Sequence, residues 1–514
     1  MRIETIRLRM TTGSGNEMVC DHPAVRAALV GKSRREEKQE FCFDSLDLGL
    51  WRQGVQLVVE RQGVRWLGQL IGLVGRSEVR QEWDCGTGEQ PDWSELKRLL
   101  AACSIEEIKS KALRPCLLVH RKEEWWRLEY PDGSRLWLCE ARGQLEWLGE
   151  EGVTEPFHEL VVQHVAGSRL RFLQTVLALG RQGGACLEPL SPAARGLARL
   201  DPGPVTAMAL ERVVWEDGER AIGGLAKAGA GRIAGMLDQL AALLYGPEQA
   251  CLEAVCNLER AVSGLRRLIG WFAEWMPERM HRDMDNELIW LAGEIRPACV
   301  GVDLRQVTLP GMRRHFPEVV HLAEAEERAR QEGGASVQRA REAVDSFRFA
   351  RLWIGLATWL SSEEGVKAAL RDSEAGVRVR QQATVDEQAQ TLLRPLIKPL
   401  KSAWAGWGRN VPVTLEELRE LLVWAEALED ALGLCGGCCE ERRASGWHEG
   451  VTVVAGAARA VVALEEERQL WQRLAADWSG QPVAALFRGW QGARLEGAWQ
   501  DWERAWASFS CHLA

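Results

Sequence analysis

The plainest sign of fold class in this chain is the stretch FCFDSLDLGLWRQGVQLVVERQGVRWLGQLI at residues 41–71. It consists of three short apolar blocks separated by two copies of the triplet RQG, and glycine in such a place favours a tight turn. In the middle block Val55, Leu57 and Val59 fall on one face, because successive side chains of a strand point to opposite sides. The stretch therefore predicts three antiparallel strands joined by turns.

Alternation of the same kind extends outward from this stretch over residues 1–180. Near the start, Ile6 and Leu8 share a face, and HELVVQHVAG at 158–167 is one more alternating strand that glycine closes. A helical insertion is expected at residues 92–102. Short alternating blocks with turns between them are typical of an antiparallel sheet or barrel. We therefore predict an α+β protein whose N-terminal domain is an antiparallel β-barrel.

Beyond residue 180 the pattern changes from strands to helices. Residues 181–205 are rich in proline and glycine, which predicts a linker between domains. From there on apolar residues recur every third or fourth position, and such a stripe suits packing in a helical bundle. We predict an all-α helical-bundle domain over 206–440 and a C-terminal helical extension over 441–514.

Composition and charge exclude several classes of protein. The chain has 514 residues, 46% of them hydrophobic and 27% charged, as in folded globular proteins. Its net charge is −9, and acidic residues outnumber basic ones both before and after residue 180, so nucleic acid is an unfavourable partner. No apolar run reaches the roughly 18 residues of a membrane span, and the start lacks the apolar segment of a secretory signal. The expected location is cytoplasmic, with no membrane partner.

Cysteine and tryptophan are weaker signs of function. The chain has 14 cysteines without regular spacing, and the one Cys-x-x-Cys pair has no second pair to complete a zinc site. We favour a glycine-rich helix end with incidental thiols over a metal site at these residues: Cys435, Cys438 and Cys439. Tryptophans near the C-terminus recur on one helix face, which predicts either core or a surface for a protein partner.

The stretch 41–71 also carries a resemblance to a known family. The residues at the matching places of the family's barrel hairpin are Phe43, Asp44, Asp47, Leu48, Gly54, Leu57, Gly63 and Trp66. On these residues the chain resembles the CYTH–CHAD proteins, in which a triphosphate tunnel metalloenzyme barrel precedes a helical CHAD domain. The resemblance implies a CYTH-like barrel over 1–180, a CHAD-like domain over 206–440, and inorganic triphosphate or another phosphate ligand as a partner.

The resemblance also implies a set of site residues. RQEW at 80–83 is similar to the family's R-x-E-W, LVHRK places an arginine where the family binds phosphate, and the last barrel strand keeps one glutamate. The implied phosphate-binding residues are Arg7, Arg9, Arg80 and Arg121. The implied metal ligands are Glu82 and Glu159, which would hold Mg²⁺ or Mn²⁺ if the protein is active. An alternative is that these arginines pair with acidic neighbours across strands as a salt-bridged interior.

Several signature positions depart from the family. Thr5, Arg7 and Arg9 replace the E-x-E-x-K of the first strand, and the last strand has Val161 and Gln163 in place of two glutamates. In the opening stretch, the positions of two tunnel cations are apolar; they are Val58 and Ile71. Triphosphate hydrolysis needs metal and cations to neutralise the phosphoryl oxygens, so such losses predict weak or lost catalysis.

The helical part departs in the same way. CHAD bundles are expected to hold polyphosphate with histidines and arginines, and the corresponding places here are Cys256, Glu259, Arg419 and Leu422. A polyphosphate-binding sleeve is therefore not expected. Only Arg266 and Arg267 form a local basic pair, which we interpret as a solvated helix face.

These observations leave three hypotheses. The leading one is a diverged CYTH–CHAD protein, a pseudoenzyme that acts as a scaffold or binding module with weak or absent hydrolysis and without a cofactor. The second is a metal-dependent inorganic triphosphatase, a hydrolase that converts triphosphate to diphosphate and phosphate, because Mg²⁺ needs only one or two protein carboxylates. The third is binding of a phosphate ligand without turnover, which needs only the arginines.

Overall fold

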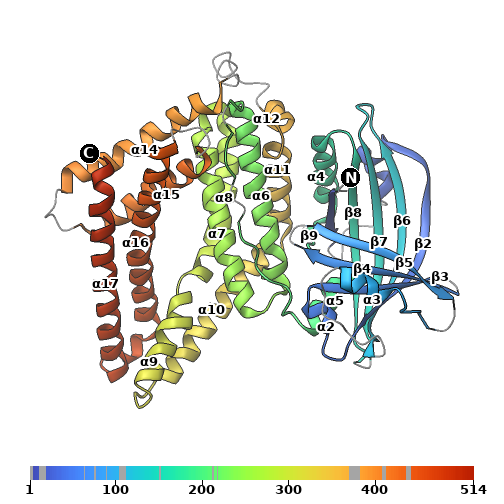
Figure 1. The fold of residues 1–514 in the computed structure, drawn as a ribbon, viewed down its shortest axis with the longest axis horizontal. Helices are drawn as coiled ribbons and strands as arrows, with labels where there is room; N and C mark the ends of the chain where they lie inside the picture. Colours follow the sequence, from blue (N-terminus) through green and yellow to red (C-terminus); the bar gives the residue numbers. More distant parts are fainter. Residues whose placement is uncertain are drawn as a thin grey trace. The chain divides into compact units, whose positions relative to one another are not determined.

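The computed structural model divides into two compact units (Figure 1). It describes residues 4–10, 19–62, 64–74, 77–87, 90–102, 112–149, 152–210, 213–216, 218–369, 383–407, 413–435 and 441–513. Unit 1 comprises Met1–Ala209, Met236–Asn257 and Arg341–Thr358, and unit 2 comprises Leu210–Gly235, Leu258–Ala340 and Trp359–Ala514. The structure is thus α+β, with an N-terminal sheet followed by helices.

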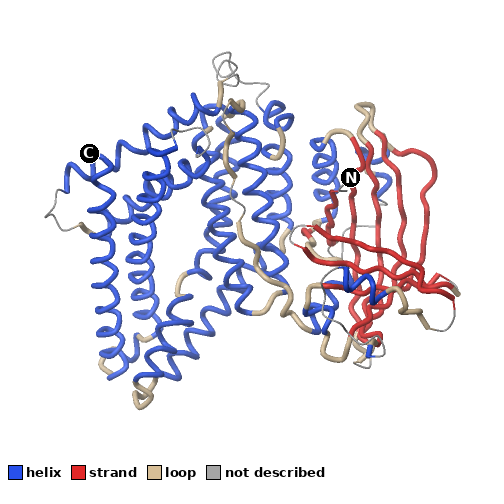
Figure 2. The backbone as a smooth tube through the Cα atoms, viewed as in Figure 1, coloured by secondary structure: helices blue, strands red, loops and turns tan. Residues whose placement is uncertain are grey.

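One antiparallel sheet organises unit 1 (Figure 2). Its strands are β1 (Glu4–Arg9), β2 (Leu29–Asp44), β3 (Val55–Gln62), β4 (Arg65–Val74), β5 (Ser77–Thr87), β6 (Arg114–Glu129), β7 (Arg135–Trp147), β8 (Thr154–Ala166) and β9 (Cys186–Leu187). Their order in the described part of the sheet is β5-β4-β3-β2-β6-β7-β8-β1-β9. The strands predicted in residues 41–71 are the end of β2, then β3 and β4.

The predicted closed barrel is wrong, because the sheet is open. Within the described residues, β5 and β9 form its two edges and do not pair with each other. The edge at β9 is two residues long, so it offers few backbone groups with which another strand could pair. Alternation along each strand predicts which residues share a face of the sheet. It does not indicate whether the first and last strands of the sheet pair with each other, which is what closes a barrel.

Turn chemistry fixes the register of the opening stretch. Gly54 has a φ of +74°, a conformation that L side chains rarely adopt, and it ends the turn between α2 (Gly49–Arg52) and β3. The Asp44 carboxylate accepts hydrogen bonds from the backbone N–H groups of Leu50 and Trp51, both at 2.9 Å. In the resulting register Leu57 lies opposite Phe43 on β2 and Leu70 on β4.

The remaining helices of unit 1 cover the sheet. They are α1 (Pro23–Arg26), α3 (Leu96–Ala102), α4 (Arg169–Gly183) and α5 (Pro192–Leu200). The segment 181–205, whose composition predicted a linker, includes β9 and α5, and most of α5 is buried. Ser191 caps α5 and Pro192 occupies its first turn, so the residues that indicated a connector begin a helix.

Helices form the rest of the chain. Four of them have residues in both units: α6 (Ala221–Tyr245), α7 (Glu248–Trp271), α10 (Leu322–Val344) and α11 (Phe347–Leu360). Those within unit 2 are α8 (Glu278–Cys299), α9 (Leu309–His315), α12 (Glu363–Ala369), α14 (Val385–Trp407), α15 (Leu415–Cys435), α16 (Glu441–Leu474) and α17 (Pro482–Leu513). Among the described residues, none of the helices is long and apolar enough to span a bilayer.

The predicted C-terminal extension is built into the core of unit 2. Apolar residues of α14, α15, α16 and α17 form one buried cluster, which includes Leu428, Val454 and Phe509. Trp502 and Trp506 belong to this cluster, at 3% and 5% exposure. The C-terminal tryptophan stripe is therefore core at these two positions. Of the cysteines at the end of α15, Cys435 is buried, and Cys438 and Cys439 lie outside the described residues.

Candidate functional site

The site implied by the resemblance would lie on the sheet face that α5 covers, which we call the inner face. Much of this face is apolar. The strand residues of its buried cluster include Cys42, Val58, Ile71, Val119, Cys139, Ala141 and Val161. The same cluster contains Ala193, Ala194, Leu197 and Ala198 of α5. The apolar residues at the two tunnel-cation positions, Val58 and Ile71, are thus part of a packed core.

Close packing holds α5 against this face. Ser191 accepts a hydrogen bond from the Ala194 N–H at 3.2 Å, which satisfies one of the free donors at the helix start. A Cβ added to Gly196 would lie 2.4 Å from Leu117 Cδ2, so a larger residue here would displace the buried Leu117 side chain. The indole N–H of Trp147 donates to the carbonyl of Gly196 at 3.0 Å. These contacts fill the space beside β6 and β7.

The polar part of the inner face contains a first group of charges, the Arg121 cluster. It consists of Glu36, Lys38, Glu40, Arg121 and Glu123, from β2 and β6. Arg121 donates to the Glu40 carboxylate, and its Nε lies 3.1 Å from Oε1 of Glu123. Lys38 Nζ lies 3.2 Å from Glu123 and 3.0 Å from Glu36. The implied phosphate-binding Arg121 is therefore neutralised within the protein.

The Arg121 cluster shifts the pKa values of its members in different directions. Burial raises the pKa of Glu40, and Arg121 opposes that change. Burial also penalises the Glu123 carboxylate, but Arg121, Trp125 and Lys38 together lower its pKa. The pKa of Arg121 is raised, because Glu40 and Glu123 outweigh the effect of burial. Arg121 and Glu123 thus form a charged pair that is stable at neutral pH.

A second group of charges, the Arg195 network, holds the implied metal ligand Glu159. Nη1 of Arg195 lies 2.9 Å from Oε1 of Glu159 and 3.1 Å from Oε2 of Glu188. The Tyr245 hydroxyl donates to Glu188 at 2.7 Å, Arg9 Nε lies 3.6 Å from the same carboxylate, and Arg9 also donates to Asp345. Glu159 is 1% exposed and Arg195 is 6% exposed. Both Arg9 and Glu159 are therefore committed to contacts within unit 1.

Burial governs the titration of the Arg195 network. It raises the pKa of Glu188, with Arg195 and the Tyr245 hydroxyl opposing it. The pKa of Arg195 is raised, because Glu159 and Glu188 outweigh burial, and burial raises the pKa of Tyr245. Such a network is costly to break, since a buried charge would lose its partner.

The other implied site residues are placed apart from these groups. Arg7 lies opposite Val161 of β8, is partly buried, and forms no ion pair among the described residues. It acts electrostatically on the buried Cys139 thiol, as Lys38 and Arg121 also do. Arg80 lies opposite Ile71 in the register of β4 and β5, and its side chain is outside the described part of the chain. Glu82 is exposed and accepts a hydrogen bond from Gln69 at 3.1 Å.

These positions do not fit the implied divalent metal. Glu82 is on β5 and Glu159 on β8, with five strands between them in the open sheet. Glu159 is already bound by Arg195. Among the described residues, no group of three or more His, Cys, Asp or Glu side chains could bind a metal ion. Glu159 is therefore already paired, and among the described residues Glu82 belongs to no group of three or more possible metal ligands.

Sequence reasoning missed the residues that neutralise this face. Lys38 and Glu123 occur in charged runs, RREEKQE and HRKEEWW, whose alternation would have placed both on the same face as Arg121. Arg195 lies in the segment predicted as a linker, so no strand pattern pointed to it. In unit 2, the basic pair interpreted as a solvated face is ion-paired instead, Arg266 to Asp285 and Arg267 to Asp430.

Comparison with known proteins finds similarity in structure alone. No protein-family model and no curated protein matches the sequence. A CHAD domain from the plant Ricinus communis matches with 14% identity and a TM-score of 0.48, covering 60% of this chain and 96% of that one. HpAC1 from Hippeastrum, a protein with a dominant triphosphatase activity, matches with 14% identity and a TM-score of 0.26, covering 39% and 96%.

A third match is PptA from Streptomyces chartreusis, with 16% identity and a TM-score of 0.36, covering 56% of this chain and 100% of that one. All three TM-scores are below 0.5.

Proposed function

We propose that this protein is a diverged CYTH–CHAD protein that has lost triphosphate hydrolysis and acts as a scaffold or phosphate-binding module. The observation that carries the proposal is the state of the inner face. Its strands are packed against α5 through an apolar cluster, and Glu159, the glutamate retained from the family's last strand, is bound by Arg195. A polyanion cannot be neutralised where cations already have internal partners and the remaining wall is apolar.

Hydrolysis is tested directly with the full chain. We expect no release of phosphate from inorganic triphosphate above background with either Mg²⁺ or Mn²⁺, because the described carboxylates do not converge on a metal. Efficient turnover would refute the proposal. If Glu82→Gln and Glu159→Gln each abolished such turnover, the metal-dependent triphosphatase would replace it.

The protein could also bind a phosphate ligand without hydrolysing it, and Arg7 is the residue at which this binding is tested. This residue is the implied phosphate ligand that has no ion pair among the described residues, and it lies near Lys38 and Arg121 around Cys139. If the protein binds a phosphate ligand on the inner face, triphosphate raises the melting temperature of the native chain and this shift falls in Arg7→Gln. Arg127→Gln, at an exposed arginine of β6, is the control. An unchanged melting temperature in the presence of triphosphate would favour the scaffold role.

A protein partner at the C-terminal helices stays a prediction. The inward tryptophans there are core, so a partner would have to use outward residues such as Val423 and Val453, which are 62% and 55% exposed.

A further inference from the structure

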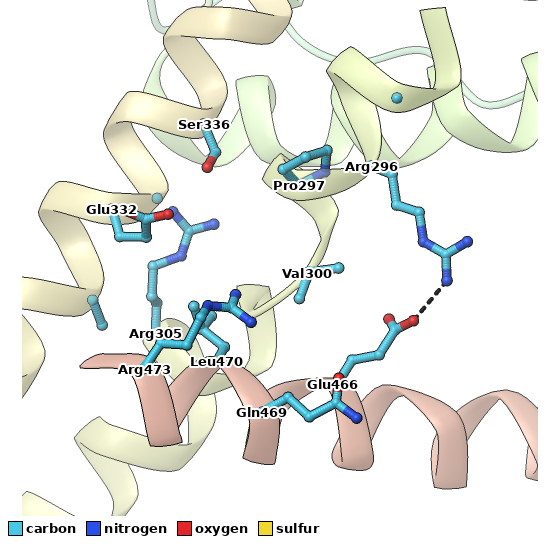
Figure 3. Close-up of a pocket in the computed structure, with 13 residues that line it drawn as sticks. Arg296, Pro297, Val300, Arg305, Glu332, Ser336, Glu466, Gln469, Leu470 and Arg473 are labelled. Carbon is cyan, nitrogen blue, oxygen red and sulfur yellow. Dashed lines mark hydrogen bonds and ion pairs between the residues drawn. The ribbon is translucent and has the colours of Figure 1, made fainter. Parts of the chain in front are cut away.

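Unit 2 contains a cavity that has no part in the inner face. Its volume is about 340 Å³, and Figure 3 shows its lining. The lining comes from the C-terminal part of α8, the π-helical turn η4 (Leu304–Thr308), α10 and α16. All of the lining residues belong to unit 2. The cavity is therefore a binding site separate from the sheet.

Three charged side chains of this cavity already interact within the protein. Arg296 donates to Glu466 at 2.6 Å, so these two side chains neutralise each other. The Arg305 guanidinium is engaged as well, in part through hydrogen bonds to the carbonyls of Ala298 and Gly301. An occupant of the cavity would have to compete with these contacts, so none of the three side chains is assigned to it.

Glu332 and Arg473 differ from these three side chains. Both line the cavity and are exposed, and neither forms an ion pair among the residues that the structure describes. Glu332 belongs to α10 and Arg473 to α16, and the two side chains extend toward the same space in Figure 3. They do not pair with each other. One anion and one cation of the protein therefore face this cavity from different helices.

The cavity also has an apolar wall. It consists of Pro297, Val300, Ala329 and Leu470. Ala329 and Leu470 are 2% and 7% exposed, so this wall continues into the packed interior of unit 2. A hydrocarbon group that covers such a wall leaves water and is stabilised, whereas an inorganic ion gains nothing from it.

Size and chemistry together restrict the occupant. Small-molecule sites start at about 300 Å³, so this cavity accommodates one small molecule. A guanidinium group binds a carboxylate through two parallel hydrogen bonds, and a carboxylate accepts strong hydrogen bonds from an ammonium group. A molecule with only one of these charged groups would leave either Glu332 or Arg473 without a partner. A molecule with both groups and a hydrocarbon side chain matches the whole lining.

We propose that this cavity binds an α-amino acid with an apolar side chain. Arg473 binds the carboxylate of the amino acid, and Glu332 binds its ammonium group. The apolar side chain lies against Val300 and Leu470. The bound amino acid and the two side chains that hold it carry no net charge in sum. The site is independent of the proposed function of unit 1.

The experiment uses the full chain, L-phenylalanine and two analogues that each lack one charged group. Phenethylamine lacks the carboxylate, and 3-phenylpropionate lacks the ammonium group. Binding is measured by titration calorimetry and by saturation-transfer NMR. We expect L-phenylalanine to bind, and each analogue to bind at least about tenfold more weakly, because each loses one charge-assisted hydrogen bond.

Two variants assign the charged groups separately. Arg473→Gln and Glu332→Gln should each weaken binding of L-phenylalanine about 10- to 100-fold. Arg473→Gln should no longer distinguish L-phenylalanine from phenethylamine, and Glu332→Gln should no longer distinguish it from 3-phenylpropionate. Matched controls are Arg488→Gln and Glu503→Gln, at exposed positions of α17 outside the cavity, which should leave binding unchanged.

Val300→Phe checks the location of the site, because a larger side chain at this wall should weaken binding of L-phenylalanine without altering any charge. Three results would overturn the assignment. In the first, L-phenylalanine does not bind the native chain. In the second, either analogue binds as tightly as L-phenylalanine. In the third, Arg473→Gln, Glu332→Gln or Val300→Phe binds L-phenylalanine as tightly as the native chain does.

Discussion

At the scale of single residues, the arginines of the inner face are distinguished by their partners. Arg121 has Glu40 and Glu123, Arg9 has Glu188 and Asp345, and Arg7 has no ion pair among the described residues. A guanidinium group that is buried with a carboxylate has already lost its water and gained its counter-charge. A second anion gains little from it. The presence of arginine predicted phosphate binding. Whether an arginine can bind a phosphate depends on whether a carboxylate of the protein already pairs with it.

Arg195 offers a direct test of the buried network. Arg195→Met leaves Glu159 and Glu188 buried without their main counter-charge, and breaking such a pair costs about 3 to 5 kcal/mol. We expect this loss in the unfolding free energy of unit 1, measured by urea dependence of hydrogen exchange in peptides from β8 and α5. The matched control is Arg199→Met on the same helix, whose side chain is 52% exposed, with an expected loss of about 1 kcal/mol or less. Equal losses in the two variants would contradict the role given to Arg195.

At the scale of elements, α5 determines what the sheet can do. Nine residues long and rich in alanine, it lies against β6 and β7 and contributes both the apolar cluster and Arg195. The strands alone would present a mixed face with several cations. With α5 in place, much of the same face is an apolar core, and Arg121 and Glu159 on it are paired.

Returning a lysine to the sheet should therefore fail to restore a tunnel. Ile71→Lys supplies the cation that the family resemblance expects, but position 71 is 7% exposed within the apolar cluster. We expect a loss of at least about 3 kcal/mol in stability, because an ammonium group would be buried without a partner, and no gain of triphosphatase activity. Val64→Lys, at a site 74% exposed in the same hairpin, should change stability by less than about 0.5 kcal/mol. A stable Ile71→Lys protein that hydrolyses triphosphate would show that the inner face is accessible.

At the scale of the whole molecule, the last two helices complete unit 2. Leu428 of α15, Val454 of α16 and Phe509 of α17 are each at most 1% exposed and share one cluster. Removal of α16 and α17 would expose the apolar side of α15 to water. The C-terminal part is thus structural in unit 2.

A shortened chain tests this conclusion. A chain that ends at residue 440 should lose protection of α14 and α15 in limited proteolysis and should aggregate, because each large side chain that is uncovered costs about 1.5 to 3 kcal/mol. The sheet of unit 1 should keep its protease resistance, which serves as the internal control. A soluble shortened chain with native protection of α15 would show that residues 206–440 form an independent domain, as the sequence predicted.

The sequence by itself determined the elements that follow from periodicity and turn chemistry. The strands of residues 41–71, the antiparallel pattern up to β8 and the helical character of the rest were predictable, because alternation and three-to-four spacing are local properties. The implied site residues were also readable as residue types. The function of these residues was not predictable, because the side chains that pair with them come from other elements and are not visible in the pattern of one strand.

Only the tertiary structure decided the rest. The sheet is open, and a segment rich in proline and glycine forms the helix α5. Arg195 pairs with Glu159, which lies 36 positions away in the sequence. The physical reason is that burial and pairing are properties of three-dimensional neighbours. A carboxylate that faces water can bind a metal, and the same carboxylate buried beside a guanidinium group cannot.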